Sequence, residues 1–341
     1  MSVPLVATLA KYGLFLAFLL GALAPIMVWI ERRVCGLIQD RPGPNRLGPF
    51  GLLQPLADAL KFIFKEDVTP TAVEKPLYLL APVLAMVPAL TTFVVIPFGP
   101  PAEIDGHTIR MVVADVDAGV LLMLALSSLG VYALVMAGYA SNNKFSLLGA
   151  IRASAQLISY ELAMAVAVLA VLLPVQSFRL DAVVDYQHEH LWNFIPQAIG
   201  FLIFLVASFA ETNRLPFDLP EAESELVAGY HTEYSAMRFA AFMAAEYINM
   251  GTLSALAATL YFGGWRLPFV TPPETWYWAA LLGFGVLAAK IMAFMMLFVW
   301  VRWTFPRFRY DQLMRLGWKV LLPLSLVNLL WVAVATLKGW L

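Results

Sequence analysis

The feature that most constrains this chain is a series of apolar stretches, each about 20 residues long and bounded by charged residues. A helix of about 20 apolar residues crosses a bilayer core about 30 Å thick, and lipid offers unpaired backbone groups no partners. Only 13% of the residues are charged, against roughly a quarter in a soluble domain. We therefore predict an all-α polytopic membrane protein, a single integral domain over residues 1–341. Its eight membrane-spanning helices are expected over residues 12–30, 77–100, 118–140, 153–175, 193–211, 239–262, 276–301 and 320–337.

The basic residues predict the orientation. Of the 22, sixteen lie in the loops after the first, third, fifth and seventh spans, and five lie on the opposite face. Because basic loops stay inside, we expect the cytoplasmic loops to be 31–75, 139–152, 211–238 and 302–319, with both termini periplasmic. The first span is predicted to be retained, because it is long for a signal peptide and Arg32 and Arg33 follow it.

Charge and cysteine content exclude several classes of function. The net charge of −1 provides no basic surface excess of the kind that binds nucleic acid, so no such partner is predicted. A single cysteine, Cys35, cannot form an internal disulfide, a zinc site or an iron–sulfur cluster. We predict no metal site, and electrons for any redox reaction must come from another subunit.

The first cytoplasmic loop contains a second kind of helix. Over residues 50–66 apolar side chains recur at helical spacing, while Asp58, Lys61 and Lys65 share another face. This pattern predicts an amphipathic helix lying along the cytoplasmic interface. Two interpretations stay open: a membrane-surface anchor, or the roof of a cavity that is open to lipid and admits an apolar substrate.

The third cytoplasmic loop is strongly acidic. Against the single Arg214, residues 211–237 carry six carboxylates, which are Glu211, Asp218, Glu221, Glu223, Glu225 and Glu233. Clustered carboxylates repel one another, and in a poorly solvated place some hold protons near neutral pH. The alternative is a solvated loop that pairs with arginines of the first and fourth cytoplasmic loops.

Three charged residues lie inside predicted spans: Glu161, Glu246 and Lys290. Such groups are costly in a bilayer and usually mark ion pathways. Glu161 lies nine residues past Arg152, and Glu246 eight past Arg238, so both should lie about 12–14 Å from the cytoplasmic face. Lys290 is expected at a similar level, where it could tune them. The two carboxylates form either a proton route or, with Lys290, a buried pair that fixes helix packing.

Long motifs resemble one known family, the H subunits of the bacterial proton-pumping NADH:quinone oxidoreductase, respiratory complex I. These proteins are equivalent to subunit 1 of the mitochondrial enzyme. The resemblance covers essentially the whole chain. It is carried by Glu31-Arg32-Arg33 with Gln39-Asp40-Arg41-Pro42-Gly43-Pro44-Asn45-Arg46, by the segment 210–234 that begins Ala210-Glu211-Thr212-Asn213-Arg214-Leu215-Pro216-Phe217, and by Pro306-Arg307-Phe308-Arg309-Tyr310-Asp311-Gln312-Leu313.

The resemblance implies a place where the membrane arm meets the peripheral arm, in the inner membrane of a bacterium. It implies no bound flavin or cluster, quinone as substrate, and NAD, FMN and iron–sulfur clusters in partner subunits. The partners would be the peripheral-arm subunits of the quinone site and the antiporter-like and small membrane-arm subunits. Residues implied at the quinone chamber are Arg32, Asp58, Lys61 and Arg302, and those at the docking face are Arg41, Arg46, Arg307 and Arg309. Residues implied in, or placed beside, the proton-coupling route are Glu161, Glu211, Asp218, Glu221, Glu223, Glu225, Glu233, Glu246 and Lys290.

Two other classes of protein stay open. A free-standing ion-coupled transporter or channel would also use buried carboxylates, and would be active without redox partners. A membrane anchor of a related hydrogenase complex would share the fold, although we would not expect it to carry the full acidic motif.

Overall fold

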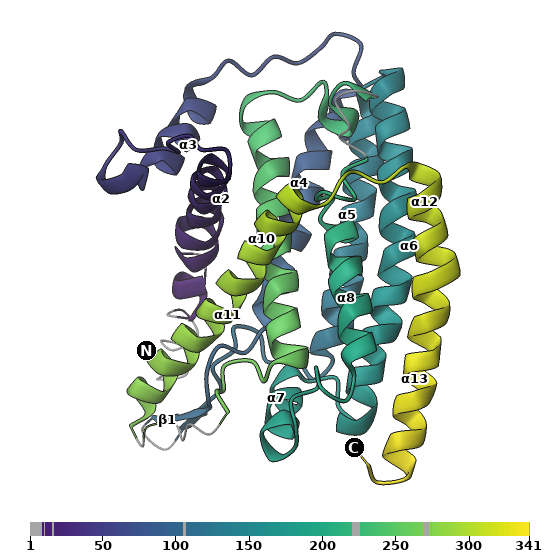
Figure 1. Ribbon diagram of the computed structural model, residues 1–341. Coiled ribbons are helices and arrows are strands. Elements are labelled where there is room, and N and C mark those ends of the chain that lie inside the picture. Colours follow the sequence, from purple (N-terminus) through teal and green to yellow (C-terminus); the bar gives the residue numbers. More distant parts are fainter. Residues whose placement is uncertain are drawn as a thin grey trace.

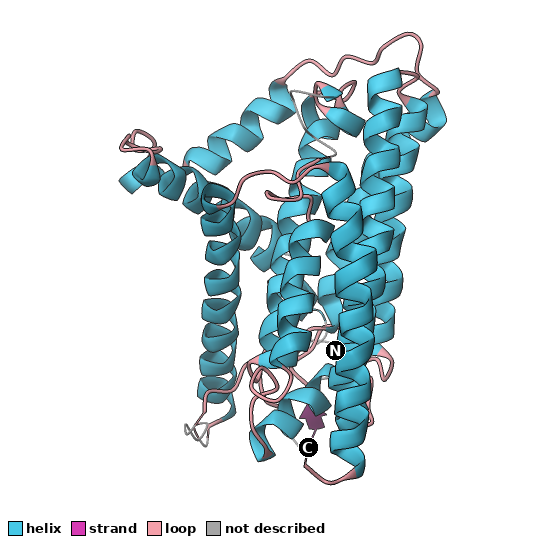
Figure 2. Cartoon of the chain, turned by 45° about the vertical axis from the view of Figure 1, so that its right-hand side comes forward, coloured by secondary structure: helices cyan, strands magenta, loops and turns pink. Residues whose placement is uncertain are grey.

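The chain forms a bundle of long helices with one small β-hairpin (Figures 1 and 2). The computed structural model describes residues 9, 11–15, 17–104, 107–219, 226–268, 273 and 275–340. The α-helices are α2 (Ala24–Ile38), α3 (Gln54–Phe64), α4 (Lys75–Thr92), α5 (Gly119–Ala140), α6 (Lys144–Val175), α7 (Leu180–Glu189), α8 (Ala198–Glu211), α10 (Ala236–Tyr261), α11 (Trp276–Thr304), α12 (Tyr310–Arg315) and α13 (Leu322–Leu337). Short π or 3₁₀ segments are η1 (Ala17–Leu23), η2 (Pro49–Gly51), η3 (Phe93–Val95), η4 (Gly229–His231) and η5 (Leu316–Leu321). The antiparallel hairpin pairs β1 (Ala102–Ile104) with β2 (His107–Ile109).

Among the described residues, six helical segments are long and apolar enough to cross a membrane. They are Lys11–Ile38, Lys75–Val95, Gly119–Ala140, Lys144–Val175, Trp276–Thr304 and Tyr310–Leu337. The other two predicted spans correspond to α8, which has 14 residues, and to α10, which has 26 and carries Arg238 and Glu246. The prediction of a mostly helical, polytopic membrane protein is confirmed, while the number of spans stays a prediction.

Helix ends differ from the charge-bounded predictions. The segment 139–152, predicted as a loop, is mostly helix, because α6 begins at Lys144 where the Asn143 side chain accepts a hydrogen bond from the Phe145 N–H. Similarly, α2 continues through Glu31 to Ile38. A charged side chain at the membrane surface ends an apolar stretch without interrupting the helical hydrogen bonds. The predicted span 77–100 ends early, at Val95, shortly before Pro97.

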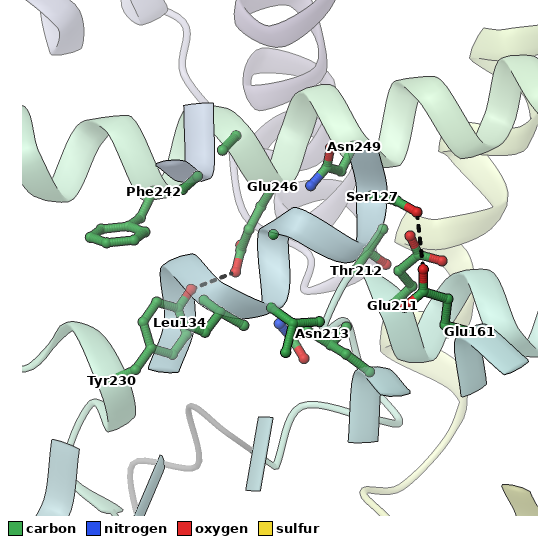
Figure 3. Close-up of a pocket in the computed structure, with 15 residues that line it drawn as sticks. Ser127, Leu134, Glu161, Glu211, Thr212, Asn213, Tyr230, Phe242, Glu246 and Asn249 are labelled. Atoms are coloured by element: carbon green, nitrogen blue, oxygen red, sulfur yellow. Dashed lines mark hydrogen bonds between the residues drawn. The ribbon is translucent and has the colours of Figure 1, made fainter. Parts of the chain in front are cut away.

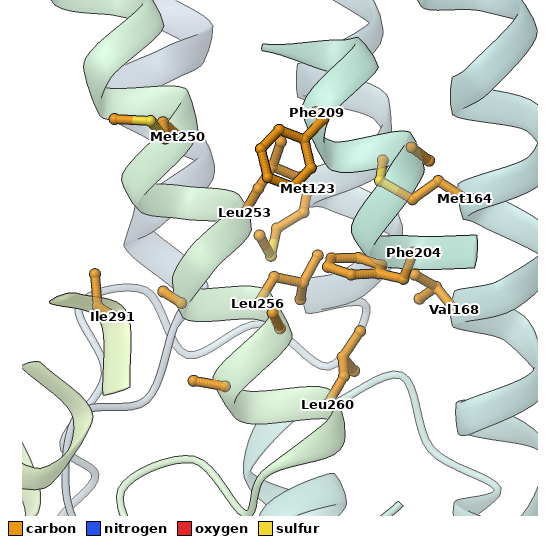
Figure 4. Close-up of a cluster of buried hydrophobic side chains, with 14 of the residues drawn as sticks. Met123, Met164, Val168, Phe204, Phe209, Met250, Leu253, Leu256, Leu260 and Ile291 are labelled. Carbon is orange, nitrogen blue, oxygen red and sulfur yellow. The ribbon is translucent and has the colours of Figure 1, made fainter. Parts of the chain in front are cut away.

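Helix α6 lies at the centre of the bundle, against α5, α8 and α13. Small residues permit these close contacts. A Cβ atom at Gly138 of α5 would lie 2.3 Å from the Cβ of Ala150 on α6, so the two helices touch at this glycine. Farther along, apolar side chains from α5, α6, α8 and α10 fill the interior, with Met164, Phe204 and Leu256 among them (Figure 4).

The bundle has an oblique helix, α11, and a pair of helices beside it, α2 and α3. Helix α11 crosses it obliquely, and α2 stands to one side with α3 at its end (Figure 1). The helix predicted over residues 50–66 is present as α3, and its apolar side chains Leu56, Leu60 and Ile63 are 60%, 46% and 56% exposed. This face therefore has little cover from the rest of the chain.

Candidate functional site

A buried ion cluster joins four parts of the chain. Glu31 of α2 is only 6% exposed, although it carries a carboxylate. Its Oε2 accepts a hydrogen bond from the Tyr247 hydroxyl of α10 at 2.7 Å, and its Oε1 pairs with Arg302 of α11. Arg214, in the segment after α8, also approaches Oε1, at 3.5 Å. We call Glu31, Arg214, Tyr247 and Arg302 the Glu31 cluster.

Arg214 connects this cluster to a second carboxylate. Its Nη2 lies 4.0 Å from Glu246 Oε2, and its guanidinium lies 4.6 Å from the centre of the Tyr247 ring. Burial by itself lowers the pKa of Arg214, whereas Tyr247, Glu31 and Glu246 raise it. Their combined effect is the larger, so the pKa of Arg214 lies above the ordinary value for arginine. Arg214 is therefore a fixed positive charge between two acids.

Three carboxylates share one small cavity, whose volume is about 60 Å³ (Figure 3). Glu246 reaches it from α10 and accepts a hydrogen bond from Tyr230 at 3.2 Å. Glu161 of α6 accepts from Ser127 at 3.4 Å and from Ser128, both on α5. We call this the carboxylate cavity, and it is large enough to hold water.

The third carboxylate of that cavity is Glu211, at the end of α8. Its Oε2 is buried and has no hydrogen-bond partner among the residues that the structure describes. The neighbouring turn is held by Gln156 of α6, whose amide donates to the carbonyls of Ala210 and Phe217 at 2.7 and 3.0 Å. Glu211 is thus positioned by its backbone, while its carboxyl group can still exchange a proton or bind water.

On the other side of the Glu31 cluster lies a larger cavity of about 610 Å³. Its lining includes Glu31, Arg32, Cys35, Arg41, Tyr247, Arg302 and Trp303. Two of the four residues implied at the quinone chamber, Arg32 and Arg302, therefore meet here. The other two adjoin it, because Arg32 pairs with Asp58 and Lys61 lies 3.8 Å from Asp58. We call this the mouth cavity.

The remaining acidic residues are placed separately. Asp218 pairs with Arg307 at 2.9 Å, and Glu233 accepts a hydrogen bond from Asn143 at 2.7 Å. Asp218 thus pairs with an arginine of the fourth predicted cytoplasmic loop, while Glu233 contacts an amide of the second, and both side chains are partly buried. Glu221, Glu223 and Glu225 lie outside the described residues.

The basic residues implied at the docking face lie in exposed segments. Arg41 donates to Gln39 at 2.8 Å, Arg309 pairs with Asp311 at 3.3 Å, and Arg46 is exposed.

The expected depth of Lys290 is wrong. Its ammonium donates to the carbonyl oxygens of Phe262, Gly264 and Arg266 at 2.6–2.7 Å. Phe262 lies sixteen residues beyond Glu246, which is about 24 Å along a helix. The expected depth assumed an upright helix, whereas α11 is oblique (Figure 1). Lys290 therefore fastens α11 to the segment that follows α10, at a distance from the carboxylate cavity.

Several residues that complete the site had weak signals in the sequence. In the sequence, Glu31 was noticeable only as part of a motif, and Arg214 only as the single basic residue in an acidic loop. A single basic residue among six acids is a signal for a buried counter-ion, and that signal was available. Tyr230 and Tyr247 carried none, since tyrosines are common at membrane interfaces.

Fold and site together define a multi-pass helical membrane protein in which buried carboxylates extend from a large polar cavity into the bundle. The chain belongs to the NADH dehydrogenase family, whose model matches residues 10–333.

Its curated relatives include several H subunits of NADH-quinone oxidoreductase. The one from Deinococcus radiodurans is 54% identical over 335 residues that cover 96% of this chain and 83% of the relative. One from Geobacter metallireducens is 49% identical over 333 residues, covering 98% and 95%. The one from Leptospira biflexa is 50% identical over 324 residues, covering 91% and 90%.

Proposed function

We propose that the chain is the H subunit of a proton-translocating NADH:quinone oxidoreductase and couples quinone reduction to proton movement through its buried carboxylates. The names of its relatives support the assembly with other subunits of that enzyme. NAD, FMN and iron–sulfur clusters belong to those partners, and quinone is the substrate. The partners include the peripheral-arm subunits of the quinone site and the antiporter-like and small membrane-arm subunits.

The proposed topology has eight spans in the bacterial inner membrane, with both termini periplasmic. Support comes from the arrangement of the helices. The end of α13 lies at the same end of the bundle as β1 and α7, while α3 and α12 lie at the opposite end (Figure 1). The loops rich in arginine belong to that opposite end, which is therefore cytoplasmic.

The mouth cavity is proposed to form part of the quinone chamber. Its lining is polar on the side of Arg32, Arg41 and Arg302, and arginine N–H groups suit the carbonyl oxygens of a quinone head group. Asp58 of α3 pairs with Arg32, so this ion pair holds α3 next to the mouth cavity. The uncovered apolar face of α3 suits the lipid interface at the chamber entrance. Arg41, Arg46, Arg307 and Arg309 are proposed to contact the peripheral arm.

One observation carries the coupling proposal: Arg214 contacts Glu31, which lines the mouth cavity, and Glu246, which lines the carboxylate cavity. Quinone reduction consumes two electrons, which come from a partner subunit, and two protons. The quinol formed is neutral, so the charge near Glu31 changes on the groups that supply the protons. A change of charge near Glu31 alters the electrostatic attraction between Arg214 and Glu31, and so the balance with its attraction to Glu246. Coulomb energy varies inversely with distance, so these short distances make both attractions strong. The proton affinity of Glu246 changes with it, and Glu211 and Glu161 follow in the same cavity.

The packing of the bundle beyond the carboxylate cavity bears on where a proton could go next. Past the carboxylate cavity the bundle is filled by apolar side chains, including Met164, Phe204 and Leu256 (Figure 4). A proton reaching Glu161 therefore meets apolar packing ahead. We propose that the signal passes sideways, to neighbouring membrane subunits. The acids Asp218, Glu221, Glu223, Glu225 and Glu233 are proposed to lie at the cytoplasmic beginning of the route.

The test uses a matched pair of neutral variants in the assembled enzyme. Glu246→Gln removes the acid that faces Arg214, and Glu189→Gln removes an exposed acid at the end of α7. We expect Glu246→Gln to lower quinone reduction and proton pumping, while NADH oxidation by a hydrophilic acceptor persists. Glu189→Gln should leave all three unchanged.

The assembly is tested first. On a native gel of gently solubilised membranes, a tagged chain should migrate with a large NADH-oxidising band. Migration alone, with that enzyme intact elsewhere, would favour a free-standing transporter or a hydrogenase anchor. Full pumping by assembled Glu246→Gln would remove this residue from the route.

A further inference from the structure

Away from the carboxylate cavity, polar side chains meet where α8, α10 and α13 come together. Tyr261, the last residue of α10, is fully buried, and Asn328 of α13 is 3% exposed. Both face the bare backbone of Gly200 on α8. A Cβ atom added to Gly200 would lie 2.8 Å from Asn328 Nδ2 and 3.6 Å from the Tyr261 hydroxyl.

These polar atoms lack hydrogen-bond partners. Within the described part of the chain, no group forms a hydrogen bond with Asn328 Nδ2, the Tyr261 hydroxyl or Gln197 Oε1. Gln197 is 1% exposed and is the N-cap of α8, three residues before Gly200. Its Nε2 donates to the Ala170 carbonyl at 3.5 Å, which leaves Oε1 for another ligand. Buried polar groups without partners are costly, most of all inside a bilayer.

We propose that a buried water molecule binds here, to Tyr261 and Asn328, with Gln197 as a third ligand. The three groups are complementary to one water. The amide Nδ2 of Asn328 donates, Gln197 Oε1 accepts, and the tyrosine hydroxyl can do either. A buried water normally makes about three such bonds.

The surroundings favour water over an apolar occupant. The Tyr261 ring packs against Phe201 and Phe204, with ring centres 5.3 and 5.7 Å apart, so its hydroxyl is the polar end of an aromatic cluster. An acyl chain or apolar side chain would leave all three polar atoms unpaired. The missing side chain at Gly200 lets Asn328 and Tyr261 approach the backbone of α8, where a Cβ atom would lie only 2.8 Å from Asn328 Nδ2. The water thus joins three helices that share no direct polar contact there among the described residues.

A density map of the assembled enzyme in lipid nanodiscs, with ordered waters visible, tests the site directly. We expect a peak within about 3 Å of both the Tyr261 hydroxyl and the Asn328 amide nitrogen. A direct hydrogen bond between these two side chains, without a peak, would overturn the proposal. Density of a lipid chain or of a partner's side chain at this point would do the same.

Thermal unfolding of the assembled enzyme gives a second, independent test. Gly200→Ala should lower the melting temperature, since the new methyl group would lie 2.8 Å from Asn328 Nδ2 and push this amide away from the water. Gly285→Ala is the matched control, because Gly285 also lies in a helix but a Cβ there would meet nothing within 4 Å. Equal melting temperatures for the two variants would contradict the site.

Asn328→Leu and Tyr261→Phe complete the test. Each alone leaves the other group unpaired, so the double variant should lose less than the sum of the two single losses. Additive losses would mean that the two side chains share no water. If a variant fails to assemble, the map of the unaltered enzyme decides.

Discussion

Replacing Arg214 by methionine should separate quinone reduction from NADH oxidation. The change keeps a long side chain but removes the positive charge between Glu31 and Glu246. With an effective dielectric constant of about 20, unit charges attract by about 5 kcal/mol at the 3.5 Å distance to Glu31 and by about 4 kcal/mol at the 4.0 Å distance to Glu246. Arg302 still pairs with Glu31, whereas Glu246 loses this positive charge and keeps the hydrogen bond from Tyr230.

The expected consequence is a Glu246 carboxyl group without the positive charge of Arg214 beside it. Removing one partner of a buried ion pair typically costs 3–5 kcal/mol, and each 1.4 kcal/mol corresponds to a factor of about ten. Only about 1.4 kcal/mol of this cost has to fall on the transition state of quinone reduction to slow it tenfold, so we expect Arg214→Met to reduce quinone-dependent NADH oxidation by about tenfold. Arg214→Lys keeps the charge without the planar fork, so its loss should be smaller.

The assay compares two electron acceptors in the same membranes. A short-chain quinone reports the complete reaction, and ferricyanide reports NADH oxidation in the peripheral arm. Both rates are divided by the amount of assembled enzyme on a native gel. Wild-type quinone reduction and pumping by assembled Arg214→Met would refute the role of Arg214 as the connection between the two cavities. A smaller amount of assembled enzyme, with both rates per assembled enzyme unchanged, would show that Arg214 serves assembly alone.

Individual contacts give three further predictions. Ser128→Ala removes a donor to Glu161 but leaves Ser127, so quinone-coupled pumping should fall several-fold less than in Glu161→Gln, and an equal loss would contradict this order. Lys290→Met deprives three backbone carbonyls of their shared donor, and the melting temperature of the enzyme should fall; an unchanged value would show that the contact contributes nothing. Gly138→Ala forces α5 away from Ala150 and should reduce the amount of assembled enzyme in a membrane extract, in contrast to Gly285→Ala.

Much of the fold followed from the local sequence. The apolar stretches predicted the helices because each must satisfy its own backbone in lipid, a constraint that depends on no other segment. The helix α3 was recognisable from the spacing of Leu56, Leu60 and Ile63 for the same reason, since periodicity is a property of one segment. The long motifs around Glu31 and Glu211 indicated the family, and the similarity to known relatives confirmed it.

The site could be predicted only in part. Glu161 and Glu246 were expected at one depth because each could be measured along its own helix from a nearby arginine, and they do line one cavity. Lys290 was misplaced by the same reasoning, because the tilt of α11 is set by packing against other helices.

The tertiary structure alone decided which charges meet. Arg214 and Arg302 lie 183 and 271 residues from Glu31 along the chain, and no local pattern links them. The sequence by itself determined that the chain crosses a membrane and carries costly charges within it, since transfer of each segment into lipid depends on that segment's own composition. The pairing of these charges depends on how helices from distant parts of the chain pack against one another, and only the tertiary structure defines that packing.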